Sequence, residues 1–269
     1  MKEIIKYLII GIVQGLGEVL PISSSAHLIL VEEILGIKDN NLTLEVFLHL
    51  ASLIALLFFL RKSLFKLIVG FLKYIFKRNK ENLIEFKICC FLIISTIPMV
   101  IIALLFKEQI SVISNNLTII SLFLVINGIL LIIINNVKGN KNFEKMKILD
   151  ALIIGLFQCI GLFPGISRSG SCIYGASFRK LEKDTAAEYA FLLFVPAVLG
   201  ATIMELSNFS KILVDDNIGR YLLSFVVTSI VTYLAFGILL KTIKKGKLKY
   251  FGYYCIGIGI ISFLGSFIK

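Results

Sequence analysis

Six stretches of this sequence are apolar over a length that spans a bilayer. Each runs for about 17 to 25 residues, the length that a helix needs to cross the hydrocarbon core. They are residues 44–60, 88–106, 117–136, 186–206, 221–240 and 250–268. The chain of 269 residues is 58% hydrophobic with a mean hydropathy of +0.93, which is too apolar for a soluble domain of this size. These features predict an all-α polytopic membrane protein with a single membrane domain over residues 1–269.

Two further apolar stretches, residues 4–30 and 148–178, are interrupted by glycine, proline, serine and charged residues. Irregular backbone at membrane depth is tolerated only where protein buries it or where it lines a wet cavity. We therefore expect each of these stretches to form a re-entrant helical hairpin. The full expectation is six transmembrane helices plus two re-entrant helical hairpins.

The basic residues predict the orientation of the chain. Of the 28 Lys and Arg residues, 20 fall in connections that six spans would place on one side, within residues 61–87, 138–147, 179–183 and 241–249. Because Lys and Arg are in excess in cytoplasmic loops, these connections are predicted to be cytoplasmic and both termini to lie outside. The same rule accounts for the formal net charge of +11, so no nucleic-acid partner is expected.

The order of a hairpin followed by three spans occurs twice, in residues 1–136 and 148–269. GIVQGLGEVLPISSS (11–25) aligns without gaps over GLFQCIGLFPGISRS (155–169), which pairs Gln14 with Gln158 and Ser24 with Arg168. Because three spans is an odd number, the second unit is predicted to be inverted relative to the first. Inverted repeats with broken helices place a polar site where the two breaks meet near the midplane. We therefore expect the two interrupted motifs to meet.

The first motif begins with a carboxylate inside an apolar segment. Gln14 and Glu18 are four residues apart, so a helix places them on one face, and Pro21 is expected to end that helix. A carboxylate in hydrocarbon costs several kcal/mol unless it is paired, hydrated or bound to a metal. Glu18 is therefore either part of a structural ion pair or a candidate catalytic residue.

Three serines and a histidine follow. Ser23, Ser24 and Ser25 are expected to occupy the break before the next helix, and His27 stands three residues after Ser24. This spacing allows a hydroxyl and an imidazole to approach each other, as in an activated nucleophile. Alone, the serines would more commonly cap the broken helices.

The second motif is typical of an anion site. Arg168 stands in PGISRSGS (164–171), where Ser167 and Ser169 flank it and Gly165 and Gly170 permit close backbone approach. A guanidinium and free N–H groups at a broken helix suit a phosphate.

Some interpretations stay open at this point. Glu18 and Arg168 could simply pair with each other. Glu45 and His49, four residues apart near the outer half of the first span, either support the site or make an ordinary structural contact. The five cysteines show no C-x-x-C spacing, so neither a disulfide framework nor a zinc site is expected. Two polar residues, Asn127 and Tyr174, are expected to make hydrogen bonds between helices.

QGLGEVLPISSSAH (14–27) and PGISRSG (164–170) together resemble the undecaprenyl-diphosphate phosphatase family, the bacitracin-resistance membrane enzymes of bacteria. EVFLHLASLIALL (45–57) and FLLFVPAVLGA (191–201) extend the resemblance over nearly the whole chain. It implies a multi-pass protein of the bacterial plasma (inner) membrane that removes the terminal phosphate of undecaprenyl diphosphate. The product, undecaprenyl phosphate, is the recycled lipid carrier for cell-wall synthesis. A divalent cation, Mg²⁺ or Ca²⁺, is implied as cofactor.

By resemblance, the functional positions of the family fall on Glu18, Ser24, His27 and Arg168, with Ser23 and Ser167 close behind. The chain departs from the family pattern at Gln14, which leaves one carboxylate for a metal, and at His49, where glutamine is usual.

The residues and the resemblance together predict a role for each group. Glu18 with Gln14 is the predicted metal site for the divalent cation. Arg168 and nearby N–H groups hold the diphosphate, together with the predicted substrate-binding residues Ser23, Ser25, Ser167, Ser169, Gly165 and Gly170. Ser24 is the nucleophile, His27 is its general base, and attack by metal-activated water is the alternative. The expected partners are a polyprenyl diphosphate lipid and membrane lipids, and a homodimer stays open. A transporter that flips a polyprenyl phosphate and a non-enzymatic lipid-binding scaffold are the competing functions.

Overall fold

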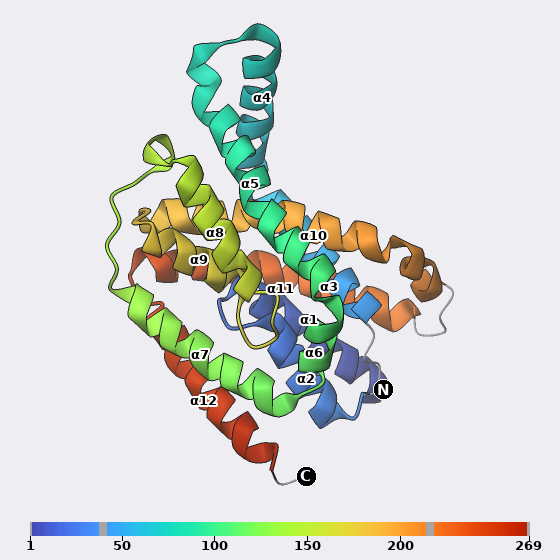
Figure 1. The fold of residues 1–269 in the computed structure, drawn as a ribbon. Helices are drawn as coiled ribbons and strands as arrows, with labels where there is room; N and C mark the ends of the chain where they lie inside the picture. Colours follow the sequence, from blue (N-terminus) through green and yellow to red (C-terminus); the bar gives the residue numbers. More distant parts are fainter. Residues whose placement is uncertain (1, 38–41, 214–217, 268–269) are drawn as a thin grey trace.

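The structure, a computed structural model, describes residues 2–37, 42–213 and 218–267 (Figure 1). Across these residues the regular structure is helical, apart from an isolated bridge between Lys141 and Leu181. The predicted all-α class is therefore confirmed.

The helices fall into two series along the chain. The first is α1 (Lys2–Val19), α2 (Ser24–Leu35), α3 (Leu42–Phe59), α4 (Arg61–Lys77), η1 (Lys80–Asn82), α5 (Leu83–Leu105), α6 (Lys107–Ser114) and α7 (Leu117–Asn135). The second is η2 (Phe143–Lys145), α8 (Ile148–Ile160), α9 (Arg168–Phe178), α10 (Lys183–Leu213), α11 (Ile218–Lys244) and α12 (Lys249–Gly265). Each of the six predicted apolar stretches lies on one helix: α3, α5, α7, α10, α11 and α12. The predicted end of the last stretch, residue 268, lies outside the described residues.

Four helices of the described chain are long and apolar enough to cross a membrane by themselves: α5 together with η1, α7, α10 over residues 183–204, and α11. The bent pair of α3 and α4 makes a fifth if it is counted as one span, and α12 has 17 residues. Large apolar side chains on these helices point outward, for example Ile93 at 59% exposure and Leu234 at 62%. A multi-pass helical membrane protein is therefore supported, while the arrangement of six spans stays a prediction.

Both expected interruptions are present. α1 ends at Val19, two residues before Pro21, and α2 begins at Ser24. α8 ends at Ile160 and α9 begins at Arg168, so residues 161–167 form the second break. Ser24, Ser25 and Arg168 thus lie in the first turn of a helix. The expectation that all three serines occupy the break is correct only for Ser23.

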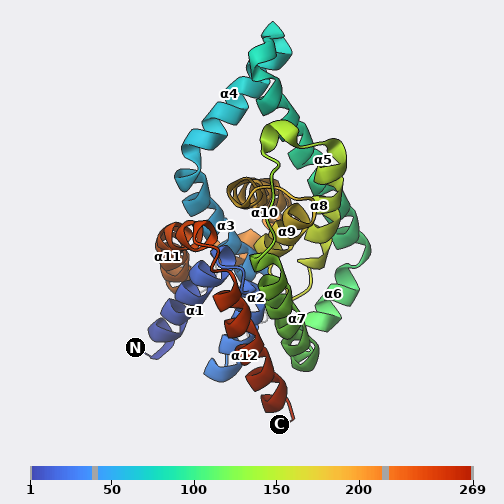
Figure 2. The ribbon, with the colours of Figure 1, turned by 90° about the vertical axis from the view of Figure 1, so that its left-hand side faces the viewer.

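Four extensively packed helix pairs join the two halves of the chain. α1 packs on α11, α8 on α5, α3 on α10, and α7 on α12. Figures 1 and 2 both show α7 and α12 lying side by side along one edge of the molecule. Since each pair takes one helix from each half, the two broken helices are enclosed by both halves.

A buried carboxylate anchors the second hairpin. Asp150, at the start of α8, is fully buried and pairs with Lys141 at 3.0 Å and with Arg179 at 2.7 Å. It also accepts the backbone N–H of Lys147 at 2.9 Å. These contacts tie the connection before α8 to the residue that follows α9, and so hold the ends of the hairpin together.

Candidate active site

The two helix breaks contact each other directly. The N–H of Gly165, in the second break, donates to Ser23 Oγ, in the first, at 3.0 Å. Asn127 of α7 bridges the same two segments, because its Nδ2 donates to Pro21 O at 2.9 Å and its Oδ1 accepts the N–H of Ser167 at 3.0 Å. The Tyr174 hydroxyl donates to the same Oδ1 at 2.7 Å. The predicted meeting of the motifs is confirmed, as are the interhelical hydrogen bonds expected of Asn127 and Tyr174.

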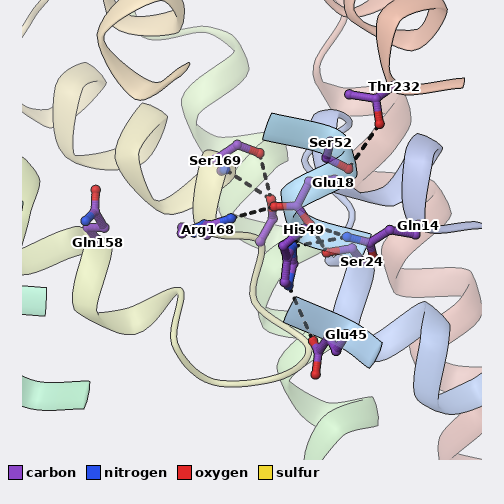
Figure 3. A network of polar contacts seen from close by, with 12 residues as sticks. Gln14, Glu18, Ser24, Glu45, His49, Ser52, Gln158, Arg168, Ser169 and Thr232 are labelled. Carbon is purple, nitrogen blue, oxygen red and sulfur yellow. Dashed lines mark hydrogen bonds and ion pairs between the residues drawn. The ribbon is translucent and has the colours of Figure 1, made fainter. Parts of the chain in front are cut away.

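Glu18 is the centre of the polar network (Figure 3). Its Oε1 contacts Arg168 Nη2 at 2.6 Å. Its Oε2 accepts from Ser24 Oγ at 2.7 Å and from Gln14 Nε2 at 3.0 Å, and it lies 2.7 Å from His49 Nδ1. The Glu18 side chain is 5% exposed, so its charge is balanced within the protein rather than by water. Glu18 does pair with Arg168, as one interpretation expected. It also accepts a hydrogen bond from the Ser24 hydroxyl, so the ion pair is part of the polar site.

Arg168 is held on two sides. Its guanidinium stacks over the ring of Phe194 at 4.5 Å, in addition to its contact with Glu18. The side chain is 19% exposed, so it does not extend to a membrane surface. A planar guanidinium fixed in this way is suited to gripping phosphate oxygens by its fork of N–H groups.

His27 is placed differently from the expectation. Its Nδ1 lies 2.8 Å from the carbonyl of Ser23 and its Nε2 lies 3.0 Å from the hydroxyl of Tyr254 on α12. A carbonyl can only accept, so in the neutral ring Nδ1 carries the proton and Nε2 accepts from Tyr254. Both ring nitrogens therefore have partners other than Ser24. The expected hydroxyl–imidazole pair is not formed in this structure, because the Ser24 hydroxyl donates to Glu18 instead.

The remaining predicted substrate-binding residues hold the breaks in shape. Ser23 has a φ of 71°, a region that side chains rarely adopt, and its strain is offset by the bonds of its hydroxyl and carbonyl. Ser167 caps α9, since its Oγ accepts from the N–H of Gly170 at 3.1 Å and lies 3.1 Å from Ser169 Oγ. Gly165 has a φ of 105° and a Cβ there would lie 2.6 Å from the carbonyl of Ile120, so only glycine fits.

The backbone N–H groups of three predicted substrate-binding residues, Gly165, Ser167 and Gly170, donate to other groups of the protein. Ser25 is half-buried in the first turn of α2. The phosphate-binding role of these residues stays a prediction.

Two site residues carried weak signals in the sequence. His49 contacts Glu18, and its Nε2 lies 3.6 Å from Glu45, so the imidazole stands between two carboxylates. The spacing of four residues between Glu45 and His49 was the available signal. Tyr254 was not predicted, because a tyrosine in an apolar helix shows no pattern that separates it from a packing residue.

Known proteins resemble this chain over nearly its whole length. Undecaprenyl-diphosphatase 2 of Bacillus thuringiensis (strain Al Hakam) is 37% identical over 265 residues, which cover 97% of each chain. Undecaprenyl-diphosphatase of Oceanobacillus iheyensis is 36% identical over 264 residues, 96% of this chain and 95% of that protein. The family model described as bacitracin resistance protein BacA matches residues 7–261 and so includes both motifs. With both breaks, the Glu18 network and Arg168 inside that match, the chain belongs to the family of the bacitracin resistance protein BacA.

Proposed function

We propose that this chain hydrolyses undecaprenyl diphosphate to undecaprenyl phosphate and inorganic phosphate in the bacterial plasma membrane. The names of its relatives support this activity, which would recycle the lipid carrier of cell-wall synthesis and confer bacitracin resistance. The observation that carries the proposal is the placement of Arg168 and Ser24 on the two oxygens of one buried carboxylate. An anion-binding cation, a hydroxyl and a proton acceptor are thereby assembled in one site. All these groups come from one chain, so the proposal does not require a second copy.

The proposed reaction begins when the diphosphate competes with Glu18 for Arg168. As the guanidinium turns to the phosphate, the carboxylate loses its strongest donor and becomes a better proton acceptor. Ser24 Oγ then attacks the terminal phosphorus, its proton passes to Glu18, and the bond to the bridging oxygen breaks to release undecaprenyl phosphate. Water then attacks the phosphorus of the phosphoserine and the bond to Ser24 Oγ breaks. Ser24 recovers the proton held by Glu18, and the remaining proton of the water leaves with inorganic phosphate.

This proposal moves the base from His27 to Glu18, because Glu18 is the group that accepts the Ser24 hydrogen bond. His27 instead helps to position the first break, because its ring donates a hydrogen bond to the carbonyl of the strained Ser23. Direct attack by water is the alternative to a phosphoserine, and it would leave Ser24 as a hydrogen-bonding group only.

A divalent cation belongs to the same proposal. Among the described residues, no group of three or more His, Cys, Asp and Glu side chains could hold a metal. Gln14 Oε1, however, is buried without a hydrogen-bond partner, while Nε2 of the same amide donates to Glu18. A half-turn of the amide would bring the unpartnered oxygen beside the carboxylate. Mg²⁺ is commonly held by one or two carboxylates together with substrate phosphates. Glu18 and Gln14 therefore fit an Mg²⁺ or Ca²⁺ ion that the diphosphate helps to hold, and such an ion would neutralise charge on the phosphate oxygens.

The proposed architecture is six spans and two re-entrant hairpins in an inverted repeat, with both termini outside. Equivalent close contacts in the two hairpins support it. A Cβ on Gly17 would lie 2.8 Å from Ser24 Cα, and one on the aligned Gly161 would lie 2.6 Å from Cα of the aligned Arg168. Both hairpins thus close on a glycine.

A second pair of equivalent contacts involves the neighbouring helices. Ser224 Oγ of α11 donates to Tyr7 O of α1 at 2.7 Å, and Ser95 Oγ of α5 donates to Ala151 O of α8 at 2.6 Å. The same shift that aligns Gln14 with Gln158 relates Tyr7 to Ala151. In one contact the serine belongs to the second half and in the other to the first half. This reciprocal arrangement is expected of two structurally equivalent repeats that pack on each other.

The experiment that tests the proposed function is phosphate release by the purified protein in detergent, with and without a chelator. In detergent no membrane separates two compartments, so transport cannot be detected and phosphate release reports hydrolysis. A transporter or a lipid-binding scaffold would release no phosphate under these conditions. We expect release from undecaprenyl diphosphate that stops when the chelator is added and returns with excess Mg²⁺ or Ca²⁺. No release under any of these conditions would overturn the proposed activity, and undiminished release with chelator would overturn the proposed cation.

A further inference from the structure

α4 and the start of α5 form an arm that extends away from the rest of the molecule (Figures 1 and 2). We call residues 61–87 the basic arm. α4 leaves α3 at an angle of 78°. The bend is held by Arg61, whose guanidinium lies 4.5 Å from the ring of Phe58 and donates to the carbonyl of the same residue at 2.8 Å. The arm therefore departs from the direction of α3, and Arg61 contacts the last turn of α3 at the bend.

The two helices of the basic arm pack closely. Gly70 of α4 faces Glu85 of α5, where a Cβ on the glycine would lie 2.6 Å from Glu85 Cβ. The Phe86 ring stacks on Phe71 at 5.6 Å and on Tyr74 at 4.5 Å. Because this packing sets the rotation of α4 about its axis, the faces that α4 turns outward are also set.

α4 presents two different outward faces, beside the buried face that carries Leu67 and Gly70. One outward face is apolar and well exposed: Phe65 71%, Ile68 56%, Leu72 44%, Ile75 46% and Phe76 79%. The other is a row of exposed lysines at spacings of four and seven: Lys62, Lys66, Lys73 and Lys77. At 100° per residue the lysine row lies directly beside the apolar face, between it and the packed face.

The placement of these faces suits a membrane surface. A helix that lies in the interface has an apolar face among the acyl chains and basic residues at the level of the headgroups. Lysines at the edge of an apolar face can extend their stems along it and hold the ammonium groups in the polar layer. α4 contains no acidic residue, so its charge is entirely complementary to anionic headgroups.

We propose that the basic arm lies in the bilayer interface and binds anionic lipid headgroups. The apolar face of α4 contacts the upper acyl chains, and the lysine row binds the lipid phosphates. The partner is a surface of anionic phospholipid, distinct from the diphosphate substrate of the Glu18 site, so this inference does not depend on the proposed function. It makes the arm a lipid-selective element beside the catalytic body.

The absence of tryptophan from the sequence permits a direct test. Phe76→Trp introduces a single fluorescent reporter on the exposed apolar face. The protein is reconstituted in phosphatidylcholine vesicles with a minority of phosphatidylglycerol, and bromine on shallow acyl positions is carried either by the anionic or by the neutral lipid at equal mole fraction. We expect quenching by the brominated phosphatidylglycerol to be at least about twofold stronger, since each basic residue near the surface attracts anionic lipid. High salt should reduce the difference.

Two triple variants in the Phe76→Trp protein assign the effect. Lys62→Gln, Lys73→Gln and Lys77→Gln remove charge from the row but keep Lys66, whose Nζ lies 3.4 Å from Glu85. This variant should lose the preference for phosphatidylglycerol and keep its phosphate release in detergent. Lys241→Gln, Lys244→Gln and Lys247→Gln remove equal charge from the end of α11 and the turn after it, and should leave the preference intact.

Several outcomes would overturn the proposal. Absence of quenching by either brominated lipid would mean that water or a protein covers the apolar face. Equal quenching by the two lipids in the unaltered arm would mean contact without charge selection. A preference that survives the arm variant, or that is lost equally in the α11 variant, would mean that the lysine row is not the binding element.

Discussion

At the scale of single residues, the site depends on how one buried carboxylate is shared. Glu18 has four partners, which differ in charge and in the protons that they can give: Arg168, Ser24, His49 and Gln14. Removal of one partner leaves the others in place but changes the charge that Glu18 presents to substrate. Substitutions of these partners can therefore distinguish three roles: phosphate binding by Arg168, nucleophilic attack by Ser24, and positioning of the carboxylate by His49.

Arg168→Lys is expected to lower phosphate release by about 100-fold or more, in the range seen when a single charge-stabilising donor is removed from an active site. An ammonium keeps the charge that pairs with Glu18 but loses the planar fork and the stacking on Phe194. The measurement is the rate in detergent, with the melting temperature as the control for folding. A near-normal rate would show that the arginine serves only to balance Glu18.

His49→Leu and His49→Gln should differ from each other. Leucine removes the donor 2.7 Å from Glu18, a hydrogen bond to a charged group worth about 1.5–3 kcal/mol, so the rate should fall by about 10- to 100-fold. Glutamine keeps an N–H donor for Glu18 and should therefore retain most of the rate. If glutamine were as damaging as leucine, the ring itself, rather than its hydrogen bond, would be required.

At the scale of elements, sequence patterns predicted the apolar helices and both breaks but not the helices at their edges. The apolar stretches predict the apolar part of each long helix. α10 and α11 extend beyond these stretches, because polar residues can continue a helix. α4 and α6 lie in segments that the six-span prediction treats as connections, because their charged residues exclude them from the apolar stretches. The helical period of α4 is nevertheless present in the sequence, in the spacing of its lysines. The hairpin motifs are visible because proline, glycine, serine and charged residues cluster in them. A single proline does not break a long apolar helix, as Pro98 in α5 and Pro196 in α10 show.

The candidate site was predictable in part. Glu18, Ser24 and Arg168 stood out because polar groups are rare in such segments, and they do meet. The partner of each group depends on how distant helices pack, which no local pattern contains. This is why the expected pairing of Ser24 with His27 was wrong and why Tyr254 was missed.

The closure of each hairpin on a glycine can be tested at Gly161. Gly161→Ala would place a Cβ within 2.6 Å of Arg168 Cα, so the backbone of the second motif must move. We expect a loss of about 1–3 kcal/mol in stability, typical of overpacking, and a fall in phosphate release. Gly257→Ala on α12 is the matched control, because a Cβ there meets nothing within 4 Å. Equal behaviour of the two variants would contradict the close approach.

At the scale of the whole molecule, the two halves enclose one site, and the proposed orientation follows from the 20 of 28 basic residues in connections on one side. Reporter fusions are expected to place residues 61–87, 137–147 and 241–249 in the cytoplasm and residues 107–116 outside. The stretches 107–116 and 137–147 flank α7, so they must lie on opposite sides if α7 crosses the membrane. Finding them on the same side would contradict the six-span inverted repeat.

The most direct test of the account is the rate of inorganic phosphate release from undecaprenyl diphosphate by the detergent-solubilised protein and its Ser24→Ala variant. If Ser24 is the nucleophile, the unaltered protein releases phosphate and Ser24→Ala loses several orders of magnitude in rate, because the groups of a covalent mechanism act as a unit. Retention of the fold in the variant is checked by its melting temperature. Phosphate release by Ser24→Ala within about tenfold of the unaltered rate, the loss expected of one hydrogen bond, would contradict the central claim that Ser24 on Glu18 is the attacking group.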